Sequence, residues 1–375
     1  MLAFAQQREN ARSMSEVIEA KNGTAPLSSR RHMLASLLFR SRLVGGVSLL
    51  RSALVRDLRI LAYHRVLSIS DDEAFDFDLE LISASASGFR EQMALLKQRF
   101  NPIRFADVIE AFEHGKRLPA RPVIVTFDDG YDDNYRVAYP ILRELGMPAT
   151  FFVSTGHIDS GLPYSYDWFV HMIARSSATR LQIRELEVDL PMPPSRMQRR
   201  ELATELLDRM KWLDASVQAA VVARLEDDWS MPRQAGHADC RPMSWDQLRE
   251  MHAGGMEIGS HGMWHSMLAK LSPEAMRAEV IDSKAALDRE LDVPAQVLSY
   301  PVGGNDAFDE NVIATAREAG YKLGCSYISG TSPMPASPEF ELRRLPIERH
   351  MDLAWFASLV GIPEAFSYPT RHRLG

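Results

Sequence analysis

Cysteine and long apolar runs are both scarce in this sequence of 375 residues. Cys240 and Cys325 are the only cysteines and form no C-x-x-C pair, which excludes a disulfide framework and a cysteine zinc site. This usage fits a reducing compartment. No stretch of roughly 18 apolar residues is present, so the sequence predicts no membrane-spanning helix. The N-terminal residues also lack the basic start and apolar run of a secretory signal.

The sequence also has no excess of basic residues. The chain carries 50 acidic and 43 basic side chains, a formal net charge of −7. Because a nucleic-acid-binding protein usually concentrates basic charge on one surface, this balance argues against a nucleic-acid partner. Hydrophobic residues make up 46% of the sequence, which is typical of a globular protein with a sizeable core.

The N-terminal arm, residues 1–57, differs in pattern from the rest. Residues 1–30 are polar and unpatterned, and we expect them to be flexible. From His32 to Leu58, apolar residues are interleaved with four arginines: Arg40, Arg42, Arg51 and Arg56. This pattern predicts one or two basic amphipathic helices. They could make peripheral contact with an anionic membrane surface, or pack on the protein's own lower face, which is the commoner role of a surface helix.

Short apolar, β-branched runs alternate with helical stretches through the rest of the chain. Seven runs are predicted strands: Leu58–His64, Val123–Phe127, Ala149–Ser154, Met256–Ser260, Gln296–Tyr300, Lys322–Ser326 and Leu342–Ile347. Pro102–Phe105 is a weaker strand. Because parallel strands need a crossover to return the chain, the alternation predicts an α/β fold with a parallel sheet. Seven or eight such units favour a barrel, with a doubly wound open sheet as the alternative.

The predicted helices have recognisable ends. They cover Gly88–Arg99, Phe105–His114, Asn134–Leu145, Trp245–Ala253, Pro273–Glu290 and Asp309–Ala319. Ser272 and Asp309 are predicted N-caps, and Gly146 and Gly320 stand where a left-handed C-cap is expected. Residues 351–375 are expected to form a C-terminal helix and tail.

The alternating pattern breaks between about residues 161 and 241. This insert begins with aromatic residues, continues through a proline cluster, and then becomes charged helical sequence from Arg196 to Asp228. We expect a helical insert over or beside the mouth of the sheet.

Residues able to carry chemistry follow four of the predicted strands. They are His64, Asp128 with Asp129, His261, and the segment Pro301–Gly304. In parallel α/β folds the functional site forms at the carboxyl ends of the strands. We therefore expect these residues to meet at one mouth.

Two of these groups together predict a metal site. After Asp128 and Asp129, Gly130 lets the chain turn sharply, so one carboxylate can bind a cation while the other stays free. A polar turn is the simpler interpretation of this motif alone. His261 and His265 are four residues apart and could share one helical face to chelate a single ion. A site with two histidines and one carboxylate leaves positions open for water and substrate, which suits catalysis.

These motifs resemble those of the polysaccharide deacetylases with a NodB homology domain, also called carbohydrate esterase family four. Residues 126–130, Thr-Phe-Asp-Asp-Gly, look like the family's first motif, and His261 and His265 match its second. The resemblance implies a distorted (β/α)7-type barrel over residues 58–350, with Asp128 as catalytic base and Asp129 as metal ligand. Zinc is the expected ion, with cobalt, nickel and manganese as alternatives. Gly262 departs from the family, which usually carries Ser or Thr there.

The third motif departs further from the family. Many members have Arg-x-Pro-x-Gly, whereas residues 299–303 here read Ser-Tyr-Pro-Val-Gly. This form resembles a subgroup that includes poly-N-acetylglucosamine deacetylases, in which a histidine on the first strand acts as general acid. His64 would then be the acid, with His350 as the alternative, and the Val302 backbone N–H would stabilise the oxyanion. Arg344 or Arg349 could replace the missing arginine beside Asp128, or could simply be solvated.

The resemblance implies an enzyme that hydrolyses the N-acetyl group of an N-acetylhexosamine in a polysaccharide or in a lipid- or nucleotide-linked precursor. Two alternatives remain: an amidohydrolase acting on a small non-sugar amide or imide, and a non-catalytic carbohydrate-binding relative. Tyr131 could touch the sugar or merely pack. In the insert, Asp167 and Trp168 could line a sugar subsite, because aromatic rings suit the apolar faces of pyranoses. The absent signal and the basic arm favour action in the cytoplasm, either free or at the inner face of the membrane.

Overall fold

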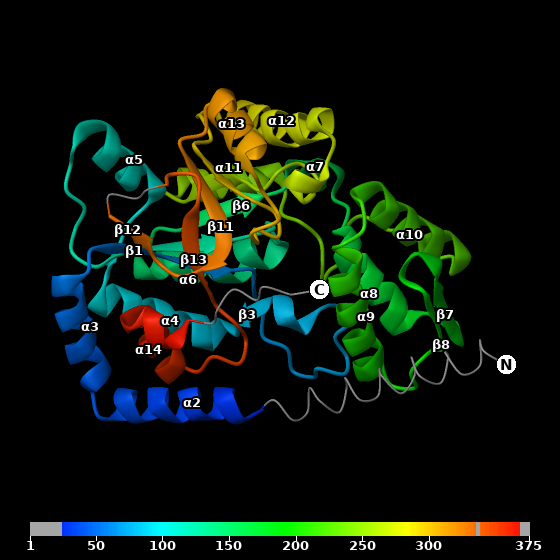
Figure 1. Cartoon of the computed structure of the whole chain (residues 1–375), viewed down its shortest axis with the longest axis horizontal. Helices are drawn as coiled ribbons and strands as arrows, with labels where there is room; N and C mark the ends of the chain where they lie inside the picture. The colour runs from blue at the N-terminus through cyan, green and yellow to red at the C-terminus, as the bar shows by residue number, and fades with distance from the viewer. Residues whose placement is uncertain (1–24, 335–337, 368–375) are drawn as a thin grey trace.

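The computed structural model describes residues 25–334 and 338–367, and its centre is a closed barrel of parallel strands (Figure 1). Strand β1 pairs with both β5 and β13, which closes the ring. In chain order the seven barrel strands are β1 (Asp57–Tyr63), β5 (Pro122–Phe127), β6 (Thr150–Val153), β9 (Glu257–Ser260), β10 (Val297–Ser299), β11 (Leu323–Ser329) and β13 (Leu342–Pro346). The predicted barrel is confirmed, and the open sheet is excluded.

Six further strands lie outside the ring in the described part of the chain, two of them in the insert. Strand β12 (Ser332–Pro333) runs antiparallel to β1, and β4 (Asn101–Pro102) pairs with the start of β5. The predicted strand Pro102–Phe105 overlaps β4 only at Pro102, because residues 103–104 are irregular and helix α5 begins at Phe105. The short strands β2 (Arg65–Val66) and β3 (Ile82–Ala84) pair with each other just beyond the carboxyl end of β1.

The helices return the chain between strands much as predicted. They are α4 (Ala86–Arg99), α5 (Phe105–His114), α6 (Tyr139–Leu145), α11 (Trp245–Ala253), α12 (Pro273–Leu291), α13 (Glu310–Ala319), α14 (Leu353–Gly361) and α15 (Pro363–Phe366). Ser272 and Asp309 cap their helices through side-chain oxygens. Gly146 and Gly320 adopt the left-handed conformation at the opposite ends. One predicted helix, Asn134–Leu145, begins instead as a π-helical turn over Asn134–Ala138.

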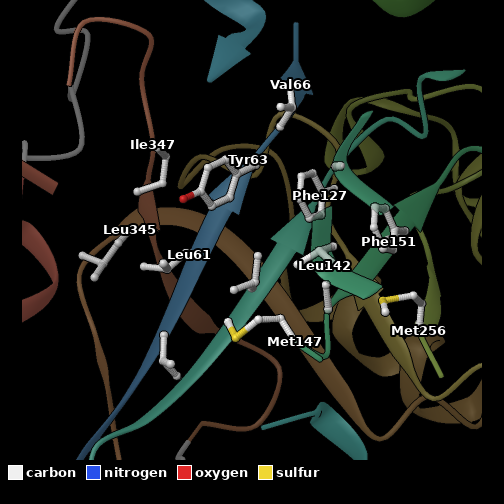
Figure 2. Close-up of a cluster of buried hydrophobic side chains, with 14 of the residues drawn as sticks. Leu61, Tyr63, Val66, Phe127, Leu142, Met147, Phe151, Met256, Leu345 and Ile347 are labelled. Carbon is white, nitrogen blue, oxygen red and sulfur yellow. The ribbon is translucent and has the colours of Figure 1, made fainter. Parts of the chain in front are cut away.

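Alternation along the strands separates two apolar layers. Leu61, Tyr63, Phe127 and Phe151 point outward into the core between barrel and helices (Figure 2). Their neighbours form a second cluster inside the barrel: Leu58, Ile60, Ile124, Phe152, Cys325 and Leu342. Both cysteine thiols are buried and free, as expected from their spacing. This interior closes the bottom of the barrel, so chemistry is confined to its mouth.

The insert forms a lobe with a hydrophobic cluster of its own. Its helices are α8 (Ser165–Arg175), α9 (Arg196–Met210) and α10 (Ala215–Asp228), which follow the short α7 (Thr155–Ser160). Figure 1 shows α8, α9 and α10 side by side, to one side of the barrel. The helical insert is confirmed, but it also contains an unpredicted hairpin of β7 (Arg180–Ile183) and β8 (Val188–Pro191).

The arm is helical where the structure describes it. Helix α2 (Ala25–Arg40) and helix α3 (Leu43–Leu54) lead directly into β1. Ala35 and Val44 are buried, and Val44 lies against Gly361 of α14. The flexibility expected for residues 1–30 falls mostly on residues 1–24, which lie outside the described residues.

Candidate active site

The carboxyl ends of the barrel strands bring three predicted ligands together. Asp129 lies just beyond β5 and His261 just beyond β9, while His265 follows on the loop after β9. The Nε2 atoms of His261 and His265 lie 3.5 and 3.3 Å from Oδ1 of Asp129. One ligand atom from each residue lies within 4.8 Å of the other two. This spacing is compatible with a single ion between them.

The hydrogen bonds around the three residues fit a cation. Oδ1 of Asp129 is buried and has no hydrogen-bond partner among the described residues, although an unpaired buried carboxylate oxygen is costly. Nδ1 of His261 lies 2.8 Å from the carbonyl oxygen of Ser299. Since a carbonyl only accepts, Nδ1 must carry the proton, which leaves the Nε2 lone pair free for a metal. Burial lowers the pKa of His265 to about 3, so its ring is neutral at pH 7.

The histidine pair does not sit on a helix, and that prediction is wrong. Residues 261–265 form a loop in which Gly262 and His265 have φ values of +73° and +58°. Glu279 of α12 holds this loop, because its Oε2 accepts the backbone N–H groups of Met263 at 2.6 Å and Trp264 at 3.0 Å. A Cβ at position 262 would lie 2.8 Å from that same oxygen. A side chain at position 262 would require Glu279 to shift, and the left-handed backbone there favours glycine over the family's usual Ser or Thr.

The free carboxylate is held by an arginine from another strand. Arg344 of β13 donates two hydrogen bonds of 2.7 Å, one to each oxygen of Asp128. Both side chains are buried. Arg344 also donates to the Ser299 hydroxyl at 3.0 Å, the residue that stands where many members have arginine. Arg344 thus replaces the missing arginine, whereas Arg349 is partly exposed and pairs with Asp72 at 2.6 Å.

His64 and His350 have different surroundings. His64 follows β1, is partly buried, and its ring centroid lies 5.5 Å from that of Tyr327. Burial raises the pKa of Asp128, but the charges of Arg344, His261 and His64 bring it below its usual value. The His350 side chain is 56% exposed and lies 3.5 Å from Glu348.

Three further residues were predicted to contact the substrate or the oxyanion, and their surroundings differ. Tyr131 is fully buried and donates to Oδ2 of Asp167 at 2.7 Å. Trp168 is 5% exposed, and its indole N–H donates to the carbonyl oxygen of Met231 at 2.8 Å within the lobe. Both side chains are buried. For Tyr131, this agrees with the interpretation that its ring packs. Val302 follows β10 and has a left-handed backbone, with φ of +63°.

Sequence reasoning missed the tyrosines that the insert places on Asp129. Tyr166 donates to Oδ2 of Asp129 at 3.0 Å, and Tyr164 donates to the backbone carbonyl of Asp129. Asp129 itself has φ of +72°. The aromatic cluster at the start of the insert was the available signal. Together the tyrosines hold the carboxylate with Oδ1 turned toward the histidines.

Removing the Tyr166 hydroxyl tests this role. We expect Tyr166→Phe to weaken metal affinity by about 10-fold to 100-fold, because hydrogen-bond partners of metal ligands orient them. The affinity is measured by calorimetric titration of zinc into apoprotein. Tyr135→Phe is the matched control, since the Tyr135 hydroxyl donates to Glu250 away from the three ligands. Equal affinities of the two variants would contradict the role.

With this geometry established, the family follows from comparison. Residues 115–324 match the family model described as polysaccharide deacetylase, and because the match exceeds half of the chain, the chain belongs to that family. The family comprises hydrolases that act on carbon–nitrogen bonds.

Three named relatives are similar to parts of this chain. It is 32% identical over 128 residues to the poly-β-1,6-N-acetyl-D-glucosamine N-deacetylase of Escherichia coli (strain K12), covering 34% of this chain and 18% of that protein. It is 33% identical over 106 residues to the enzyme of that name from Staphylococcus aureus (strain N315), covering 26% and 36%. Bacillus subtilis YxkH is 23% identical over 248 residues, covering 65% and 58%. The chain thus spans less than two thirds of the length of these relatives.

Solved structures share the fold. The Streptococcus pyogenes deacetylase PplD, in complex with acetate, superposes with a TM-score of 0.54 at 21% identity, covering 83% of this chain and 99% of that one. IcaB from Ammonifex degensii gives a TM-score of 0.51 at 17% identity, covering 81% and 96%.

Proposed function

We propose that this chain is a metal-dependent deacetylase that hydrolyses the N-acetyl group of an N-acetylhexosamine in a polysaccharide or a lipid- or nucleotide-linked precursor. One observation carries the proposal. Two adjacent aspartates have different partners: Asp129 faces two histidines with an unpaired oxygen, and Asp128 is bound by Arg344. A protein that only binds sugar has no need of a separate base beside a cation site.

Asp129, His261 and His265 would hold the ion. Their nitrogen and oxygen donors suit zinc, and also cobalt, nickel or manganese. When bound, the ion supplies polarisation of the acetyl carbonyl and a lower pKa for the attacking water. Three protein ligands leave room for both groups.

The protein's own groups divide the proton transfers. Asp128 accepts a proton from the attacking water, and Arg344 keeps the carboxylate ionised and fixed for that step. His64 donates a proton to the departing amine nitrogen, a task suited to an imidazole at the end of a strand. The Val302 N–H donates to the oxygen that becomes negative as the carbonyl is attacked.

The choice of general acid is testable with paired histidine variants. We expect His64→Ala to lower kcat by about 10²-fold to 10⁴-fold, the usual contribution of a positioned acid. His350→Ala should leave kcat within about twofold, since its side chain is largely exposed and lies beside Glu348. Steady-state acetate release from one N-acetylglucosamine oligomer measures both. A reversed order of the two effects would assign the acid to His350.

The substrate class is tested by acetate release from several compounds. The full chain, loaded with zinc, is assayed on N-acetylglucosamine oligomers, a lipid-linked N-acetyl sugar, a nucleotide-linked N-acetyl sugar and a small non-sugar amide. We expect release from at least one sugar and none from the amide. Hydrolysis of the amide alone would move the function to a non-sugar amidohydrolase. Sugar binding without release would make the chain a carbohydrate-binding relative.

A further inference from the structure

Exposed apolar side chains are concentrated on helices α2 and α3. Of thirteen large hydrophobic residues that are exposed in the described part of the chain, nine lie between positions 33 and 55: Met33, Leu34, Leu37, Leu43, Val47, Leu49, Leu50, Leu54 and Val55. Leu37 is 64% and Leu50 66% exposed. Concentrated exposed apolar surface of this kind marks an interaction site in a soluble domain.

Another face of the two helices packs against the rest of the protein. Ala35, Val44 and Ser48 are buried, and Gly361 of α14 lies against both Val44 and Ser48. The helices are therefore fixed to the barrel through one side. The exposed leucines lie outside this contact between the helices and α14.

The charge of this segment is opposite to that of the whole chain. Residues 25–56 contain six arginines and no aspartate or glutamate, in a chain of net charge −7. Arg51 is bound by Asp57 and Glu364. Arg30, Arg40, Arg42 and Arg56 are exposed, and within residues 25–334 and 338–367 none of these four makes an ion pair. Arginines without an acidic partner, next to exposed leucines, suit the surface of a lipid bilayer, because its headgroups can be anionic and the acyl chains below them are apolar.

The shape of the pair favours lying on such a surface. Helices α2 and α3 have 16 and 12 residues, or roughly 24 and 18 Å at 1.5 Å per residue, against a hydrocarbon core of about 30 Å. Taken singly, no described helix is long and apolar enough to cross a bilayer; the segments Arg30–Arg40 and Leu43–Leu54 meet the length and composition criterion only jointly, and they are bent by 92°. Two short helices joined at a right angle can both rest in one plane.

We propose that α2 and α3 form a docking surface for an anionic lipid bilayer. Their exposed leucines enter the boundary between headgroups and acyl chains, and Arg30, Arg40, Arg42 and Arg56 contact lipid phosphates. Helix α3 leads into the amino end of β1, whereas the proposed active site lies at the carboxyl ends of the strands. Docking therefore leaves the mouth of the barrel uncovered (Figure 1).

Vesicle sedimentation of the full chain tests this proposal. The vesicles contain either phosphatidylcholine alone or an equal mixture with phosphatidylglycerol. We expect binding to the anionic vesicles that weakens as salt is raised, and at least tenfold weaker binding to phosphatidylcholine. The double variants Leu37→Ser/Leu50→Ser and Arg40→Gln/Arg42→Gln should each lose about tenfold in affinity for the anionic vesicles.

A matched variant distinguishes binding through α2 and α3 from nonspecific adsorption of exposed apolar side chains. Met197→Ser/Trp212→Ser removes two apolar side chains of the insert that are 49% and 59% exposed, and this variant should bind vesicles like the unaltered chain. All variants should keep the melting temperature and the acetate release measured on a soluble oligomer. Equal binding to both vesicle types, no binding to either, or equal losses in the control variant would overturn the proposal. So would a dimer, seen by light scattering, that Leu37→Ser/Leu50→Ser dissociates, because the surface would then serve a second copy of the chain.

Discussion

Replacing Asp128 with asparagine should lower kcat for acetate release by about 10³-fold while the protein keeps its metal. An amide cannot accept the proton of the attacking water, and a positioned base contributes about 10²-fold to 10⁴-fold. The ion should remain, because its expected ligands are Asp129, His261 and His265. Initial rates of acetate release and elemental analysis of the same preparation measure both quantities.

Asp129→Asn is the informative partner of this variant. It alters the neighbouring carboxylate, whose Oδ1 lies beside both histidines, and should lose metal and activity together. Thermal melting of both variants checks that the barrel is intact. If Asp128→Asn retained more than about a tenth of the activity, the base would have to be another group.

Removing Arg344 should be costly for both folding and catalysis. Arg344→Met leaves Asp128 buried and without its bidentate partner, and breaking a buried ion pair from one side costs about 3–5 kcal/mol of unfolding free energy. The unpaired carboxylate is also free to rotate away from the attacking water. We expect kcat to fall with stability, as measured by urea unfolding and acetate release.

Two control variants distinguish the effect of the paired hydrogen bonds to Asp128 from the effect of the positive charge alone. Arg344→Lys keeps the charge but cannot donate to both oxygens of Asp128 at once, so we expect an intermediate loss of stability. Arg349→Met removes a partly exposed arginine that pairs with Asp72, and should change neither property appreciably. Unfolding of Arg344→Met at the same urea concentration as the unaltered chain would contradict the structural role.

The strands and the meeting of the site residues were predictable because both depend on local sequence. A buried run such as Val123–Phe127 marks a strand, and the carboxyl ends of parallel strands must share one edge. Asp128, Asp129 and His261 could therefore be brought together without any knowledge of distant contacts.

Features that depend on neighbours across the barrel were harder to predict. Arg344 reaches Asp128 because closure places β13 and β5 on either side of β1, and one sequence does not reveal which strands are adjacent. The spacing of His261 and His265 fits a helix as well as a loop. Only Gly262, whose φ is positive, indicated the loop.

Aromatic residues of the insert were the least predictable part of the site. Tyr166 and Trp168 are two residues apart, yet one binds Asp129 and the other lies within the lobe. Nothing in composition separates a ring that holds a candidate ligand from one that packs, because both are aromatic residues of the same short segment. The distinction depends on where the hydroxyl or indole N–H finds its partner.

The central claim is that Asp129, His261 and His265 hold the ion on which deacetylation depends. The most direct test measures metal content and acetate release from an N-acetylglucosamine oligomer on one preparation, before chelation, after chelation, and after zinc is restored. We expect one ion per chain before chelation, loss of activity when the ion is removed, and recovery of both when zinc is restored. His265→Ala should recover neither. Acetate release that persists in the metal-free protein would contradict it.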